Sequence, residues 1–151
     1  MGKKESTFSG ELKKSCEELG IFYYKIPDAY GMARFAPQKP FDAIMIHKGK
    51  VYCIENKIQT KKSAFALNRI KPHQIEGLQR AQNSGAISYI LINYRFKGFN
   101  KILVLNLGIL NILIKETKSI KIKDLDVFDF AERIKYNNKT IWDIKKICSI
   151  N

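Results

Sequence analysis

The chain has few cysteines, and their arrangement fits neither a zinc site nor a disulfide framework. Cys16, Cys53 and Cys148 are odd in number, lie far apart and form no Cys-x-x-Cys pair. Reduced thiols are typical of the cytoplasm, and the first residues are too polar for the apolar core of a secretion signal. We therefore expect a cytoplasmic protein.

Long hydrophobic runs are also missing. The most apolar stretch, residues 101–114, is interrupted by Asn106, Gly108 and Asn111. It is too broken to span a membrane and predicts instead a buried strand that leads into an apolar helix. The 151 residues contain no repeat, no low-complexity linker and no shift in composition. We expect a single domain over residues 1–151, because this length suits one substantial core.

Acidic residues are scarce relative to basic ones. Fourteen Asp and Glu stand against 27 Lys and Arg, which gives a net charge of +13 and a pI near 9.7. A hydrophobic content of 45% excludes a disordered chain. So large a positive excess on so small a protein favours a polyanionic partner, above all nucleic acid. The alternative is a general bias of composition, because Ile and Asn are abundant here as well as Lys.

Apolar periodicity and turn residues predict alternating helices and strands. They give a helix from Ser9 as cap to Gly20 as stop, a strand over 21–26, a polar excursion over 27–40, a hairpin over 41–57, a loop over 58–71, a helix over 72–83, and strands over 86–94 and 101–107. The last forty residues predict a short strand at Ile120 and Ile122, a helix over 125–134, and a terminal helix over 140–150 that is capped by Thr140 and anchored by Trp142. This order is typical of an α/β sandwich.

The segment 40–57 carries the clearest functional pattern. Two apolar runs flank Lys48 and Gly49, where glycine accepts the positive φ of a tight turn. A two-residue turn pairs His47 with Lys50, and this pair fixes the register of the whole hairpin. A slip by one residue would move every side chain to the other face.

This register gathers two carboxylates and an ammonium group at the open end of the hairpin. Asp42 stands opposite Glu55, with Cβ atoms about 4.5–5.5 Å apart. Lys57 lies on the same face, because side chains alternate along a strand. Two carboxylates this close repel each other unless a cation or a proton lies between them. The pattern predicts a divalent-cation site beside a phosphodiester; the alternative is an ordinary hairpin with an exposed Glu and Lys at its edge.

The order of elements and the Asp…Glu-x-Lys spacing over residues 9–94 resemble the PD-(D/E)xK nuclease superfamily. Three later runs are similar to those of RecU-type Holliday junction resolvases: Ser63-Ala64-Phe65-Ala66-Leu67-Asn68, His73-Gln74-Ile75-Glu76 and Gly85-Ala86-Ile87. The resemblance implies a restriction-endonuclease-like α/β/α sandwich with a central mixed sheet. It also implies a structure-selective DNA endonuclease that resolves four-way junctions.

The chain departs from the RecU pattern before the catalytic Asp. RecU resolvases insert a long stalk there that enters the junction, whereas residues 27–40 form a much shorter excursion. Either a reduced stalk serves the same purpose or the junction preference is altered. Tyr30, Arg34 and Phe35 in this excursion are candidates for stacking on opened bases or wedging between them. The alternative is a loop pinned by its own aromatic residues.

The resemblance implies Mg²⁺ as cofactor, with Mn²⁺ as the alternative ion. Asp42 and Glu55 would be direct ligands, and the main-chain carbonyl of Asn56 a third. Lys57 would lie near the attacking water, where an ammonium group stabilises negative charge or, with a lowered pKa, helps to take the proton.

Three further positions match the family. Glu11 corresponds to an additional acid that faces the metal in several members; otherwise it is a surface residue favoured by the helix dipole. Gln74 would orient Lys57 or a metal-bound water, or else only cap its helix. His73 is a candidate for a phosphate contact or for a structural imidazole.

Basic residues after the hairpin would flank the site and bind phosphates, unless they only solvate a loop. They are Lys61, Lys62, Arg69 and Lys71. Symmetric nicking of a junction requires two active sites related by a two-fold axis, so a resolvase of this size implies a homodimer on branched DNA. Two alternatives stay open: a nuclease that acts on duplex or flapped DNA, and a module that binds nucleic acid without cutting it. We expect no membrane partner and no small-molecule cofactor beyond the metal.

Overall fold

The structure is a computed structural model that describes residues 3–28 and 38–150. At its centre lies a six-stranded sheet in the order β1-β2-β3-β5-β6-β8. The strands are β1 (Phe22–Lys25), β2 (Ala43–His47), β3 (Lys50–Gln59), β5 (Ile87–Phe96), β6 (Phe99–Asn106) and β8 (Asp129–Ala131). β3 and β5 run parallel, whereas the other neighbouring pairs are antiparallel. The sheet is therefore mixed, as predicted.

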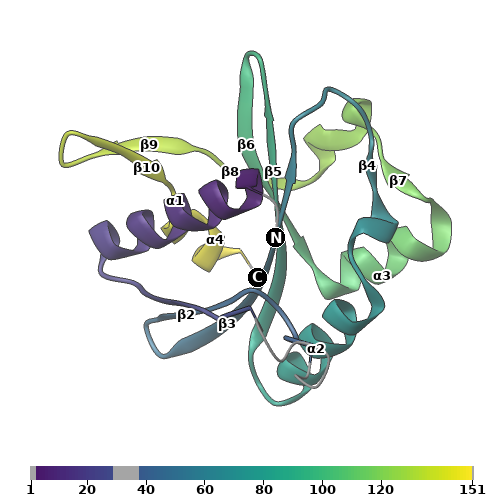
Figure 1. The fold of residues 1–151 in the computed structure, drawn as a ribbon, viewed down its shortest axis with the longest axis horizontal. Helices are drawn as coiled ribbons and strands as arrows, with labels where there is room; N and C mark the ends of the chain where they lie inside the picture. The colour runs from purple at the N-terminus through teal and green to yellow at the C-terminus, as the bar shows by residue number, and fades with distance from the viewer. Residues whose placement is uncertain (1–2, 29–37, 151) are drawn as a thin grey trace.

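Helices cover both faces of the sheet (Figure 1). α1 (Lys3–Leu19) and α4 (Ile144–Ser149) lie on one face, and α2 (Pro72–Asn83) and α3 (Leu107–Glu116) lie on the other. Each face has its own cluster of buried apolar side chains. The predicted α/β/α sandwich is confirmed. No helix in the described ranges is long and apolar enough to cross a membrane.

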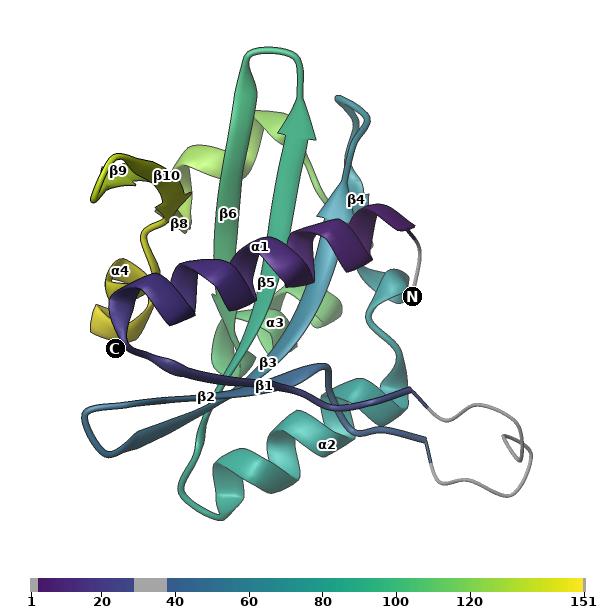
Figure 2. The same ribbon diagram turned by 60° about the vertical axis from the view of Figure 1, so that its left-hand side comes forward.

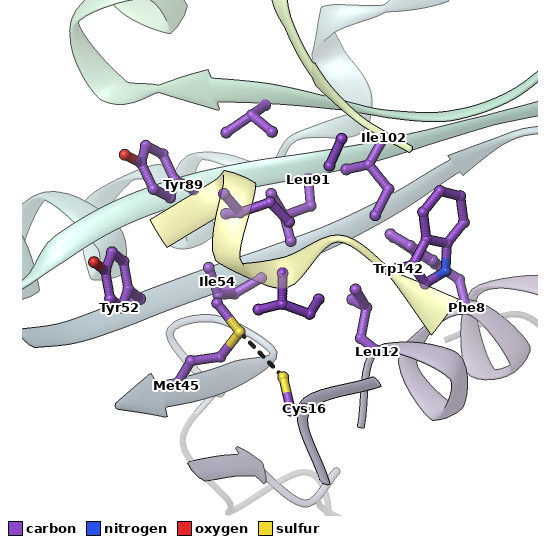
Figure 3. Close-up of a cluster of buried hydrophobic side chains, with 14 of the residues drawn as sticks. Phe8, Leu12, Cys16, Met45, Tyr52, Ile54, Tyr89, Leu91, Ile102 and Trp142 are labelled. Atoms are coloured by element: carbon purple, nitrogen blue, oxygen red, sulfur yellow. Dashed lines mark hydrogen bonds between the residues drawn. The ribbon is translucent and has the colours of Figure 1, made fainter. Parts of the chain in front are cut away.

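α1 lies across the sheet (Figure 2) and begins earlier than the sequence indicates. Its buried stripe starts at Phe8, one turn before Leu12, and Phe8 packs edge to face on Trp142 with 6.1 Å between ring centroids (Figure 3). This contact extends the helix back to Lys3. The prediction that Ser9 caps the helix is wrong: Ser9 lies inside α1 and is buried.

The predicted loop over 58–71 is partly ordered into short elements. β3 continues to Gln59, and β4 (Phe65–Ala66) pairs with β7 (Ser119–Ile120) in a second, two-stranded sheet. A 3₁₀ turn, η1 (Leu67–Arg69), then leads into α2, which has the predicted bounds.

The helix predicted over 125–134 is wrong. The segment forms a 3₁₀ turn, η2 (Ile122–Val127), followed by β8 and β9 (Arg133–Tyr136). β8 pairs with the outer side of β6. The free edge of β6 thus gains hydrogen-bond partners that no local pattern indicates.

The terminal helix predicted over 140–150 is also wrong in its first half. β10 (Lys139–Trp142) pairs with β9 across a turn at Asn137 and Asn138, whose φ values are 49° and 63°. Asparagine tolerates this conformation and favours the tight turns of hairpins, a signal that the apolar pattern obscures. α4 begins only at Ile144, capped by Asp143, which accepts a hydrogen bond from the Lys146 N–H.

Candidate active site

The hairpin of β2 and β3 has the predicted register. His47 pairs with Lys50 and Ala43 with Ile54, across a turn in which Lys48 and Gly49 both have positive φ. One residue beyond this ladder, Asp42 stands opposite Glu55, as counting from the turn predicts.

The main chain of β3 fixes Asp42 in place. The Asp42 N–H donates to the Ile54 carbonyl at 2.9 Å, and the Asn56 N–H donates to Asp42 Oδ2 at 2.9 Å. Because both contacts join the backbone of β3 to the segment before β2, the carboxylate cannot leave the strand without breaking the hairpin end. Asp42 is 3% exposed.

Glu55 and Lys57 lie on the same face of the sheet and are also buried. Their neighbour Cys53 belongs to the apolar cluster on the α2 face, and alternation places Glu55 and Lys57 on that face too. The Lys57 Nζ lies 3.3 Å from Glu55 Oε2. Asn56 points to the opposite face, where its Nδ2 donates to Ser9 Oγ at 3.1 Å.

The electrostatics of Glu55 distinguish it from an ordinary carboxylate. Burial, together with the negative charge of Asp42, raises its pKa to about 8, although the ammonium group of Lys57 lowers it. Its Oε1 is buried and has no hydrogen-bond partner in the described part of the chain. A carboxylate oxygen in this position is stabilised by a proton or a cation.

Lys39 belongs to the site, although the sequence pattern did not single it out. Its Nζ lies 3.1 Å from Asp42 Oδ1 and 2.5 Å from Asp28 Oδ1. The signal in the sequence is a basic residue three positions before Asp42, but only the fold shows that the two side chains meet. Both oxygens of Asp42 are therefore engaged.

Comparison with known proteins identifies the family. Residues 18–148 match the model of RecU, recombination protein U. The chain belongs to the RecU family. Its members are Holliday junction resolvases and therefore nucleases. This family assignment confirms the predicted resemblance.

The structure of one archaeal resolvase is similar to this fold. It is Hjc of Archaeoglobus fulgidus, a Holliday junction resolvase, with a TM-score of 0.53 and 13% identity over 81% of this chain and 90% of the Hjc chain. At that identity the likeness concerns the fold, and it confirms the restriction-endonuclease-like sandwich. No curated protein matches the sequence.

Resolvases of this superfamily use a divalent metal, and the oxygen atoms of this RecU-family site fit one. Glu55 Oε1 is an unpartnered buried acceptor among the described residues, and Asp42 Oδ1 already faces a cation in Lys39. Mg²⁺ prefers such hard oxygen ligands and retains several waters. The described residues contain no group of three or more His, Cys, Asp and Glu able to hold a metal ion. Main-chain oxygens and water would thus supply the remaining ligands.

The structure places Glu11 away from these carboxylates. Its side chain forms ion pairs with Arg95 and Arg133 and accepts a hydrogen bond from Trp142 Nε1 at 3.2 Å. Helix α1 lies on the face opposite Glu55, so Glu11 joins the N-terminal helix to the C-terminal hairpin.

Gln74 and His73 lie in the first turn of α2. Gln74 Oε1 accepts a hydrogen bond from the Lys71 N–H at 2.8 Å, which is the capping role that was the alternative for this residue. His73 is partly exposed beside it.

The predicted phosphate-binding residues differ in their surroundings. Lys61, Lys62 and Lys71 are exposed. Arg69 instead turns inward: its Nη atoms donate to Gln59 Oε1 and to the Ile58 carbonyl, each at 2.7 Å. Tyr30, Arg34 and Phe35 lie outside the described residues, as does most of the excursion over 27–40.

Proposed function

We propose that this RecU-family chain is a Mg²⁺-dependent endonuclease that nicks four-way DNA junctions symmetrically as a homodimer. The observation that supports this most directly is that Asp42 lies beside Glu55 and Lys57 of the central strand β3, with a buried Glu55 oxygen that has no partner among the described residues. A site of this kind is costly in a protein that only binds DNA, because a buried polar atom without a partner destabilises the fold.

Asp42 and Glu55 would hold the ion, with the Asn56 carbonyl as a further ligand. A bound Mg²⁺ supplies a nucleophilic water and neutralises charge on the phosphate. Mn²⁺ has the same preference for oxygen and is the alternative ion.

In this proposal Lys57 binds and orients the phosphate group of the DNA. Its Nζ lies beside Glu55 Oε2, so it is held by a carboxylate that itself faces the ion. From this position the ammonium group stabilises the negative charge that develops on the phosphate oxygens. The neighbouring strand β5 buries its aliphatic stem, since Lys57 pairs with Ile92 in the parallel ladder.

A homodimer follows from the product, because two nicks placed symmetrically need two active sites and one chain carries one. The exposed basic residues Lys61, Lys62 and Lys71 would hold the arms of the junction, together with His73. The high positive charge supports a DNA affinity that falls steeply with salt.

The test is cleavage of a labelled four-way junction and of linear duplex with the same sequence, in Mg²⁺, Mn²⁺ or EDTA. Paired symmetric nicks in the junction, absent in EDTA, are the expected result. Equal cutting of duplex or flapped DNA would favour a general nuclease, and tight binding without cutting would favour a binding module. Sedimentation of the protein alone checks the dimer.

Asp42→Asn is the sharpest variant for this test. The amide oxygen still accepts the Asn56 N–H, so the hairpin end is preserved, whereas the charge that holds the ion is lost. We expect no cleavage and unchanged junction binding, and the same for Glu55→Ala. Asp124→Asn, an exposed carboxylate on η2, is the control and should cleave normally. Cleavage by Asp42→Asn at the normal rate would refute the metal assignment.

A further inference from the structure

A cavity lies at the far end of the sheet face that carries the candidate active site. It has a volume of about 560 Å³, within the range of about 300–1,000 Å³ that is usual for ligand sites. Four segments line it: the hairpin of β5 and β6, the loop after β3, η2 and β8. We call it the hairpin-tip pocket. It shares none of its lining with Asp42, Glu55 or Lys57.

The hairpin-tip pocket faces the same way as the candidate active site. Phe96, Phe99 and Phe130, which line it, pack against the apolar cluster that contains Cys53. Glu55 lies on the same face, because it is two residues after Cys53 in β3. A strand of DNA bound across this face would therefore meet both sites.

Side-chain hydrogen bonds hold the loop that joins the two sites. Gln59, two residues after Lys57, donates from its Nε2 to the Lys61 and Ser63 carbonyls, each at 3.2 Å. Arg69 in turn donates to Gln59 Oε1. This network fixes the loop that brings Lys62 to the rim of the pocket. Lys62 is five residues after Lys57, and five residues span at most about 17 Å even in a fully extended chain. This length corresponds to about five base pairs along B-DNA.

The lining combines aromatic rings with positive charge. Phe96 and Phe99 stack with 5.0 Å between ring centroids, and Phe130 meets Phe99 edge to face. Lys101 lies over the rings of Phe99 and Phe130 and pairs with Glu132.

Three more lysines surround these rings, and one carboxylate accompanies them. Lys62, Lys97 and Lys123 are exposed, and none of them forms an ion pair among the described residues. Asp126 is the acid in the lining. Ammonium groups beside phenyl rings match a phosphate beside a base.

We propose that the hairpin-tip pocket binds one unstacked nucleotide of the DNA, within about five positions of the scissile phosphate. Its base packs on the phenylalanine cluster and its phosphate contacts Lys62, Lys97 and Lys123. The path of the DNA strand from the active site to the pocket rests on the proposed function. The binding of the nucleotide itself needs neither metal nor cleavage. A four-way junction offers unstacked nucleotides at its centre, whereas duplex DNA does not.

The test measures binding in EDTA, so that it is independent of catalysis. The probes are a dodecamer of thymidine and an abasic oligonucleotide of the same length, which keeps the phosphates and lacks the bases. We expect the thymidine probe to bind about tenfold more tightly, because stacking of a base on an aromatic ring contributes to the binding free energy. Phe99→Leu should abolish this preference, and Phe99→Tyr, which keeps the ring, should retain it.

Replacing Lys97 and Lys123 together by alanine should weaken binding of both probes and reduce the salt slope by about 0.7 for each lost phosphate contact. The control is the double variant Lys145→Ala with Lys146→Ala, which removes two exposed lysines from α4 on the opposite face of the sheet. It should leave the affinity for both probes and the salt slope unchanged. Equal affinity for the two probes, or an unchanged preference in Phe99→Leu, would overturn the proposal. If the natural protein does not cleave the junction but retains the preference for bases, only the proposed function is contradicted.

Discussion

The ammonium group of Lys39 lies 3.1 Å from Asp42 Oδ1, at the oxygen that a metal ion would use. The other oxygen of Asp42 accepts the Asn56 N–H. Burial lowers the pKa of Lys39, but Asp28 and Asp42 outweigh burial and hold that pKa above its ordinary value. Without a metal ion the site thus contains a cation of its own, and an ion bound as proposed would have to displace it.

Lys39→Met should therefore tighten Mg²⁺ binding. Removing a competing ion pair of about 0.5–1 kcal/mol is expected to lower the dissociation constant about two- to fivefold. Calorimetric titration of the protein without DNA measures this directly. Lys50→Met, the same change at the exposed far end of the hairpin, is the control. Weaker Mg²⁺ binding by Lys39→Met would show that Lys39 helps to assemble the site instead of competing for it.

Glu55 makes the stability of the metal-free protein depend on pH. Its pKa is about 8 in the folded protein against an ordinary value of 4.5, so the folded state holds a proton that the unfolded state releases. This contribution to stability is complete below pH 4.5 and is lost as pH rises through 8. We expect the free energy of unfolding in EDTA to fall over that window by an amount on the order of a few kcal/mol.

Glu55→Gln should remove this dependence. In EDTA at pH 8 the variant should be more stable than the natural protein, and at pH 5 the two should be alike. Thermal unfolding across this range is the measurement, with Glu116→Gln as an exposed control. Mg²⁺ should stabilise the natural protein at pH 8 and have little effect on Glu55→Gln. A natural protein whose stability in EDTA is flat between pH 5 and 8 would contradict the raised pKa.

The hairpin of the candidate active site could be predicted because its determinants are local. The turn at Lys48 and Gly49 sets the register, and strand alternation then places Asp42, Glu55 and Lys57 without knowledge of the rest of the fold. Lys39 could not be found in this way. It lies outside the ladder, and its contact with Asp42 depends on how the chain enters β2.

The predictions from the sequence are wrong where contacts with distant segments of the chain determine the local structure. α1 extends to Lys3 because Phe8 meets Trp142, 134 positions further along the chain. β8 is a strand because β6 offers it an edge. The position of Glu11 has the same origin, since Arg95 and Arg133 come from β5 and β9. None of these partners is visible in a window of sequence.

Gly77 allows α2 to touch the segment that carries Asp42. A Cβ at this position would lie 2.6 Å from the Pro40 carbonyl oxygen and closer still to Pro40 Cβ. Gly77→Ala should push this segment away, destabilise the protein by about 1–3 kcal/mol and slow cleavage. Unfolding in urea and the cleavage rate are the measurements.

A second helical glycine provides the matched control. Gly10 in α1 is exposed, and a Cβ added there would meet no atom within 4 Å beyond the backbone of its own helix. Gly10→Ala should therefore stabilise the protein by about 0.4–1 kcal/mol, because alanine favours the helix. If both substitutions stabilise the protein, the close approach of Pro40 to α2 does not exist in solution.

Arg69 and Lys61 should separate stability from DNA binding. Arg69 holds Gln59 and the Ile58 carbonyl and lies over the Phe65 ring, 4.6 Å from its centroid. Arg69→Ala should lower the free energy of unfolding by about 1–3 kcal/mol, because it leaves buried acceptors unpaired. It should leave the salt dependence of junction binding nearly unchanged, since the guanidinium is already engaged.

Lys61→Ala should weaken DNA binding and leave stability nearly unchanged, which is the reverse of the effect of Arg69→Ala. Lys61 is exposed, so its loss should change stability by less than about 0.5 kcal/mol and reduce the salt slope by about 0.7–0.9, the value of one phosphate contact. Both quantities are measured on the same preparations, by urea unfolding and by salt titration of junction binding in EDTA. If Arg69→Ala reduces the slope as much as Lys61→Ala does, Arg69 contacts DNA and leaves its internal partners when the junction binds.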